Sequence, residues 1–175
     1  MKIKLTVLVV VSVMQAAVFA APVVSYDLTQ LLDNTWLCEY TISNDSESDI
    51  YQFSLWFDYN LYSDLSIEST PQINAAWDQW LGQPNVDFAA DGIFDALALD
   101  GSQITQGDSV SGFAVSFTWL GTDTPGCQLF EIYDPDDYTS SVFSGDTVLV
   151  PEPISLLLTL MGVPFLRRSN FAKTA

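Results

Sequence analysis

Alternation of apolar and polar side chains most constrains what the middle of this sequence can fold into. It is clearest over residues 36–43, 51–59 and 113–119, where every second residue is apolar. A period of two places each apolar set on one face of a β-sheet. Shorter segments with strand composition are separated by turn-forming residues and cover residues 65–69, 93–99, 128–133 and 147–150. We therefore expect an all-β fold, an immunoglobulin-like antiparallel β-sandwich.

One stretch does not follow this alternation. Trp77 and Trp80 are three residues apart, and Leu81 lies beside them. Residues with this spacing are neighbours on one face of a helix. The pattern predicts a single helical turn over residues 74–81, packed against an edge of a sheet.

The charged residues are divided between the middle and the ends of the chain. There are 22 acidic and five basic residues and no histidine, and the basic residues are Lys2, Lys4, Arg167, Arg168 and Lys173. Residues 22–153 therefore carry no cationic side chain. Binding nucleic acid requires cations that neutralise phosphates, so we expect no nucleic-acid partner. Catalytic triads and zinc sites built on histidine are excluded too.

Residues 1–21 have the order of a secretory signal peptide. Lys2 and Lys4 precede an apolar run over residues 5–14, and small residues follow up to Ala21. Cleavage after Ala20 or Ala21 fits this order. The alternative is an uncleaved membrane anchor, which the run disfavours because it is shorter than a span of ~20 residues.

The C-terminal segment is set apart from the body by two prolines. Pro151, Glu152 and Pro153 precede an apolar run over residues 154–166, which ends at Arg167 and Arg168. Arginines stay on the cytoplasmic side of a membrane, which would leave the acidic body outside. The alternative is that this run is the last buried element of the domain.

This C-terminal arrangement resembles the sorting signal of PEP-CTERM proteins. The resemblance implies that exosortase, a membrane-embedded cysteine transpeptidase-like enzyme, processes the tail near the Pro-Glu-Pro triplet. It also implies an inner-membrane intermediate, followed by the cell surface or extracellular matrix of a Gram-negative bacterium that makes exopolysaccharide. The body resembles immunoglobulin-like modules of such proteins over residues 40–45, 92–99 and 110–119. The expected division is signal peptide 1–21, acidic β-sandwich 22–149 and sorting signal 150–175.

Cys38 and Cys127 are the two cysteines of the chain. An even number in an exported protein predicts a structural disulfide. Such a bond would close a loop of about 90 residues, worth at most ~4–5 kcal/mol. The alternatives are two buried free thiols or a reactive thiol, although the body has no cation that could lower a thiol pKa.

Carboxylates are the charged groups available in the body. Their densest groups are Asp45, Glu47 and Asp49, and Asp134, Asp136 and Asp137. Hard oxygen ligands suit Ca²⁺, and the alternation at 45, 47 and 49 resembles the start of a calcium loop. Ile50 stands where an EF-hand requires glycine. We expect no cofactor other than a possible calcium ion, and solvated turns are the alternative explanation.

Trp56, Trp77 and Trp80 are the candidates for binding carbohydrate. Trp56 is predicted on the face opposite its aromatic neighbours. Aromatic side chains beside carboxylates suit sugars, although an aromatic in a sandwich also serves as core or edge cover. A glycosidase needs two carboxylates across a cleft, for which a small sandwich with short loops has little room.

Together these features predict a non-enzymatic, exported cell-surface or extracellular-matrix protein. The alternative is a carbohydrate-binding module retained on exopolysaccharide. Exposed aromatic side chains near acidic residues would favour the module, and buried tryptophans would favour a structural role.

Overall fold

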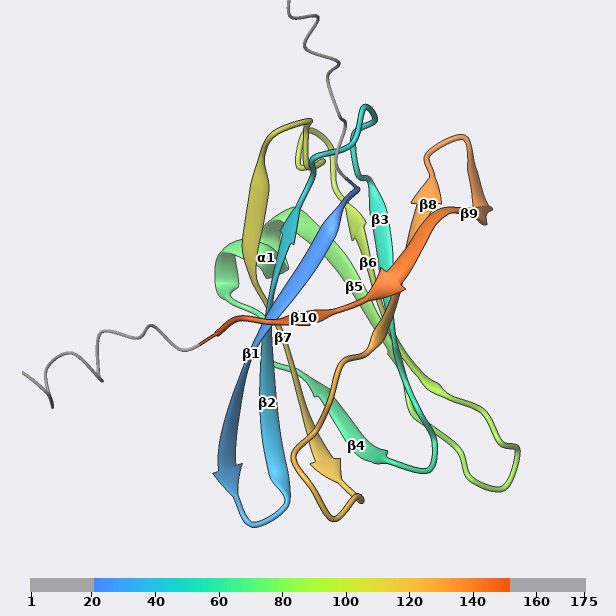
Figure 1. The fold of residues 1–175 in the computed structure, drawn as a ribbon. Helices are drawn as coiled ribbons and strands as arrows, with labels where there is room; N and C mark the ends of the chain where they lie inside the picture. The colour runs from blue at the N-terminus through green and yellow to red at the C-terminus, as the bar shows by residue number, and fades with distance from the viewer. Residues whose placement is uncertain (1–20, 152–175) are drawn as a thin grey trace, which may run out of the picture.

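The computed structural model describes residues 21–151, which form the two layers of a β-sandwich (Figure 1). The strand orders of the two sheets are β10-β1-β2-β7-β4 and β5-β6-β3-β8-β9. The elements are β1 (Val23–Leu32), β2 (Thr35–Ser43), β3 (Gln52–Phe57), β4 (Tyr62–Ile67), α1 (Pro71–Ala76), β5 (Trp77–Gly82), β6 (Gly92–Ala98), β7 (Ser109–Trp119), β8 (Leu129–Asp134), β9 (Asp137–Asp146) and β10 (Val148–Leu149). The predicted all-β sandwich is confirmed at this level.

Every segment predicted as a strand overlaps a strand of the structure, but β1, β5 and β9 were not predicted. In β1 only Val24 and Tyr26 are buried, and the second half of the strand is largely exposed. β9 is rich in serine, and Phe143 is its side chain that packs against the core. Strands that bury so little lack the alternation by which a sequence reveals them.

The predicted helical turn over residues 74–81 is confirmed for residues 74–76, which end α1, and is wrong for residues 77–81, which lie in β5. The helix α1 begins earlier, where the Thr70 side chain accepts a hydrogen bond from the Ile73 N–H and Pro71 occupies the first turn. It ends at Trp77, which begins β5. Because side chains alternate along a strand, Trp77 and Trp80 face opposite sides of the sheet. Trp77 is 2% exposed in the core, and Trp80 is 61% exposed.

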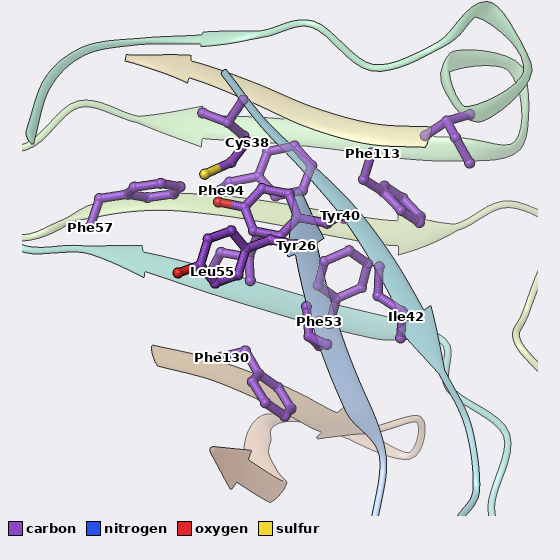
Figure 2. Close-up of a cluster of buried hydrophobic side chains, with 14 of the residues drawn as sticks. Tyr26, Cys38, Tyr40, Ile42, Phe53, Leu55, Phe57, Phe94, Phe113 and Phe130 are labelled. Atoms are coloured by element: carbon purple, nitrogen blue, oxygen red, sulfur yellow. The ribbon is translucent and has the colours of Figure 1, made fainter. Parts of the chain in front are cut away.

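The core is an aromatic cluster between the two sheets, centred on Phe53 of β3 (Figure 2). The Phe53 ring centroid lies 5.0 Å from that of Phe113, across the sandwich, in an edge-on arrangement. It lies 5.9 Å from Trp77 and 6.1 Å from Phe94. The pairs with Phe113 and Trp77 are edge-on, which is a favoured geometry of aromatic rings. The cluster therefore joins the inner faces of the two sheets.

A second feature of the interior is a chain of buried polar groups around Gln128. Tyr40 Oη donates to Gln128 Oε1 at 3.2 Å, and Gln128 Nε2 donates to Tyr62 Oη at 2.9 Å. Thr147 Oγ1 also donates to Gln128 Oε1, at 3.2 Å. Within residues 21–151, every buried side-chain nitrogen and oxygen has a hydrogen-bond partner. The polar groups of the core are therefore satisfied.

The last described residues return to the first strand. β10 pairs in parallel with β1, with Ser25 opposite Val148 and Tyr26 opposite Leu149. The Val150 N–H then donates to the Tyr26 carbonyl at 2.9 Å. Residues 1–20 of the predicted signal peptide and the predicted sorting helix lie outside the described residues. Between residues 21 and 151, no helix has the length and apolar character needed to cross a bilayer.

Candidate functional site

The predicted disulfide is not formed, and Cys38 and Cys127 are both free thiols. Cys38 points inward from β2 and is fully buried, whereas Cys127 precedes β8 and is exposed. The residue after Cys127, Gln128, is the one that is buried in the core. Burial raises the pKa of the Cys38 thiol to about 12, against the lowering effect of a hydrogen bond with Tyr40. Cys38 is thus a core side chain rather than a nucleophile.

The two acidic groups singled out as possible calcium ligands lie around one surface hollow of about 690 Å³. Glu47, Asp49, Asp134 and Asp136 line it, whereas Asp45 and Asp137 do not. In the part of the chain that the structure describes, no three acidic or cysteine side chains are arranged to hold a metal ion. The calcium site therefore has no assembled ligand set here.

Local hydrogen bonds account for the shapes of both acidic loops. Asp134 accepts from the Asp136 N–H at 2.9 Å, and Asp137 accepts from the Thr139 N–H at 3.1 Å. The loop at 45–49 is instead organised by the buried Asn44, whose Nδ2 donates to the carbonyls of Ser48 and Ile104. Asparagine is a frequent turn residue, and the sequence predicts a turn at Asn44 but not that its side chain holds this loop.

The candidate tryptophans divide between the core and the surface. Trp77 is part of the core, so it cannot contact a ligand. Trp56 and Trp80 lie on the outer side of the second sheet, Trp56 half-buried and Trp80 exposed. The prediction that Trp56 faces away from its aromatic neighbours is confirmed, because Phe53, Leu55 and Phe57 are all buried.

Strand register brings the two surface indoles together with two carboxylates. Residues opposite one another in antiparallel strands point to the same side. One row across the sheet contains Trp80, Asp95, Ser54 and Glu131, and the next contains Gly82, Ile93, Trp56 and Leu129. We call this surface the aromatic face and define it by Trp80, Ile93, Asp95, Ser54, Trp56, Leu129 and Glu131.

Gly82 gives the Trp80 ring its position. A Cβ atom at residue 82 would lie 2.9 Å from Cη2 of Trp80 and 3.0 Å from Cγ2 of Ile93. The indole therefore lies across the glycine, toward Ile93, which is the residue opposite Trp56. Trp80, Ile93 and Trp56 therefore lie on the same side of three neighbouring strands, β5, β6 and β3.

Hydrogen bonds hold the carboxylates of the aromatic face in place. Asp95 Oδ2 accepts from Ser54 Oγ at 2.7 Å and from Gln52 Nε2 at 2.9 Å. Glu131 Oε2 accepts from the Trp56 indole N–H at 3.1 Å and from Tyr133 Oη at 3.0 Å. All of these donors are neutral. The bond from Trp56 to Glu131 fixes the indole beside a carboxylate.

The aromatic face continues at one end into a second hollow, of about 570 Å³. Trp56, Glu131 and Leu129 line it together with Asp58 and Asp91. Asp95 and Glu131 were not singled out in the sequence, because 22 acidic residues offer too many pairs. The available signal was their outward position in predicted strands beside Trp56.

Comparison with known proteins gives distant likenesses. No family model and no curated protein sequence matches the chain. Among solved structures, a GH20 exo-β-N-acetylglucosaminidase from Vibrio harveyi in complex with N-acetylglucosamine aligns with a TM-score of 0.39 and 10% identity. The alignment covers 75% of this chain and 18% of that enzyme. A CaDoc0917–CaCohA2 complex at pH 5.5 aligns with a TM-score of 0.33 and 11% identity, covering 73% of this chain and 99% of that one. Neither a sugar nor a partner is assigned to this chain from them.

Proposed function

We propose that this chain is a non-enzymatic, exported cell-surface or extracellular-matrix protein whose sandwich binds polysaccharide on the aromatic face. The observation that carries the proposal is the placement of Trp56 and Trp80 on one side of one sheet, joined by Ile93 and bordered by Asp95 and Glu131. The apolar face of a sugar ring stacks on indoles, and its hydroxyls donate to carboxylates.

The shape of the site favours binding over catalysis. Asp95 on β6 and Glu131 on β8 lie in one row across the sheet, with Ser54 of β3 between them. A glycosidase instead sets its carboxylates on either side of the scissile bond. An open sheet surface suits a polymer that lies across the strands.

Strand order supports the finer assignment to an immunoglobulin-like sandwich. That fold pairs its first, second, fifth and fourth strands in one sheet and its third, sixth and seventh in the other. Here β1-β2-β7-β4 and β3-β8-β9 have the same order. On this assignment the hairpin β5–β6 is an insertion that widens the second sheet and brings Trp80 and Asp95 to the site.

Replacing Trp80 with alanine is expected to weaken polysaccharide binding about tenfold, because loss of one stacking contact costs ~1–1.5 kcal/mol. Since Trp80 is 61% exposed, stability is expected to stay within ~0.5 kcal/mol of the wild type. Retardation of the full chain in gels cast with hydroxyethyl cellulose or glycol chitin measures the affinity. Phe88→Ala is the matched control, because Phe88 is 81% exposed and lies outside the aromatic face.

Gly82→Ala tests whether binding depends on the position of the Trp80 indole and not only on its presence. The added Cβ would displace the Trp80 ring while keeping the side chain, so a similar loss of binding is expected. Equal retardation of wild type and Trp80→Ala in every gel, or no retardation of the wild type, would contradict a role for the aromatic face.

Delivery through a PEP-CTERM tail is a separate part of the proposal. We expect exosortase to act on the tail near Pro151, Glu152 and Pro153 after the chain enters the inner membrane. The intact mass of protein recovered from its native cells should then lack about twenty N-terminal residues and everything beyond the triplet. A mass that still includes Arg167 to Ala175 would instead indicate a retained tail.

A further inference from the structure

We infer that the aromatic face selects a polysaccharide with free ammonium groups, an amino-sugar polymer that has lost its N-acyl groups. The inference rests on the proposed function and adds the chemical class of the ligand. It follows from the charge of the face, from the partners of its carboxylates and from the position of the indoles beside them.

Within residues 21–151, the carboxylates of the aromatic face have no cationic partner. No lysine, arginine or histidine occurs between Pro22 and Pro153. The partners of Asp95 are the side chains of Gln52 and Ser54, and those of Glu131 are Trp56 and Tyr133. Among the described residues, these carboxylates therefore have only neutral hydrogen-bond partners and no ion pair.

Acceptor capacity also remains on these groups. An ionised carboxylate offers about four lone-pair sites. Among the described residues, the hydrogen bonds to Glu131 all reach Oε2, which leaves Oε1 to accept from a ligand. An ammonium group supplies both the charge and the N–H donors that such an oxygen accepts.

The geometry places each carboxylate beside an indole. Asp95 is directly opposite Trp80 in the register of β5 and β6, and Glu131 is bonded to the Trp56 indole. A cation near an indole face gains a cation–π attraction as well as the ion pair. The strands that carry the two carboxylates, β6 and β8, are two strand spacings apart, about 10 Å, so cationic units of one polymer can meet both sites.

Charge also excludes the opposite class of polymer. Both hollows that border the second sheet are lined by carboxylates, Asp58 and Asp91 at one and four acidic side chains at the other. A polymer with uronic acid, sulfate or phosphate groups would meet only like charge along this path, which is destabilising. A neutral N-acetylated polymer would retain the stacking contacts but lose the ion pairs.

The test compares two oligosaccharides that differ only in the charged group. Binding of the glucosamine hexamer and of the N-acetylglucosamine hexamer to the purified full chain is followed by tryptophan fluorescence. The free-amine hexamer is expected to bind at least about tenfold more tightly. The double variant Asp95→Asn, Glu131→Gln should remove this preference and leave the affinity for the acetylated hexamer within about twofold. Both amides keep an oxygen that can accept the neutral hydrogen bonds.

The control substitution is Glu39→Gln, which removes one exposed carboxylate from the other sheet and should leave the preference intact. Equal affinity for the two hexamers, or tighter binding of the acetylated one, overturns the inference. In that case the proposed function is still supported if Trp80→Ala weakens the binding of both hexamers. A further outcome is that hexalysine binds as tightly as the free-amine hexamer, with an affinity that Trp80→Ala does not change. The aromatic face then recognises cations in general, and the inference is wrong. If neither hexamer binds, the inference is rejected, and the proposed function is rejected with it only if the gels also show no retardation of the wild type.

Discussion

Raising the pH from about 8 to about 11 is expected to lower the free energy of unfolding by at least ~3 kcal/mol. The reason is a group of acids that stay protonated inside the sandwich. Burial raises the pKa of Cys38 from 9.0 to about 12. Burial also raises the pKa of Tyr40 and of Tyr62 above its usual value, although the hydrogen bond from Gln128 lowers that of Tyr62.

The direction of the effect follows from proton linkage. In the unfolded chain Cys38 loses its proton near pH 9, but in the folded protein it keeps the proton up to about pH 12. Between these values the folded state binds more protons than the unfolded state, so stability falls as the pH rises. The contribution of Cys38 is complete below about pH 9 and is lost by about pH 12. The buried tyrosines add to the loss above their ordinary pKa of 10.0.

Urea unfolding curves at several pH values, followed by tryptophan fluorescence, measure this change. Repeating them in 1 M salt, where the Debye length is ~3 Å, screens the repulsion among surface carboxylates and leaves the effect of the buried groups. Cys38→Ala should reduce the dependence on pH between about 9 and 12, whatever it costs at neutral pH. An unfolding free energy that stays constant up to pH 11 would show that these groups ionise without opening the core.

Gln128→Leu is expected to destabilise the domain by ~3–5 kcal/mol, the second of the large effects. Leucine has nearly the same size, but it cannot accept from Tyr40 and Thr147 or donate to Tyr62 and the Gly126 carbonyl. Each buried polar group left without a partner costs ~1–3 kcal/mol. The measurement is the urea midpoint at neutral pH, with the slope checked for unchanged cooperativity.

Gln30→Leu is the matched control for that substitution. Gln30 is exposed and makes one hydrogen bond, to the Asp33 carbonyl, so its replacement should change stability by less than ~0.5 kcal/mol. If Gln128→Leu proves equally neutral, water or a shift of the tyrosines must replace the lost partners. The polar chain would then contribute little to the stability of the fold.

The sequence predicted the parts of the fold that repeat with a period of two. Strong alternation located β2, β3 and β7 and assigned Trp56 to the outer surface. The prediction failed where the alternation is weak, as in β9. It also failed where one spacing of residues fits both a helix and a strand. Trp77 and Trp80 are three apart, which places them together on a helix but on opposite faces of a strand. The difference decided which of them is available to a ligand.

The aromatic face itself could not be predicted, because it depends on pairing between strands distant in sequence. Trp80 and Asp95 meet only in the register of β5 and β6, and Trp56 meets Glu131 only in that of β3 and β8. A shift of one residue in either pairing would turn these side chains to the other face. The disulfide prediction was wrong for a related reason. An even number of cysteines does not indicate where the two thiols lie, and here Cys38 is buried whereas Cys127 is exposed.

The parallel pairing of β10 with β1 gives the sandwich a particular response to mechanical load. A pull applied before Val23 and after Leu149 acts on opposite ends of two strands that run in the same direction. Their hydrogen bonds, together with the bond from Val150 to Tyr26, are then sheared simultaneously rather than broken one after another. A domain tethered at one terminus and dragged from the other would therefore resist by the combined strength of this short edge, before the sheets themselves carry any force.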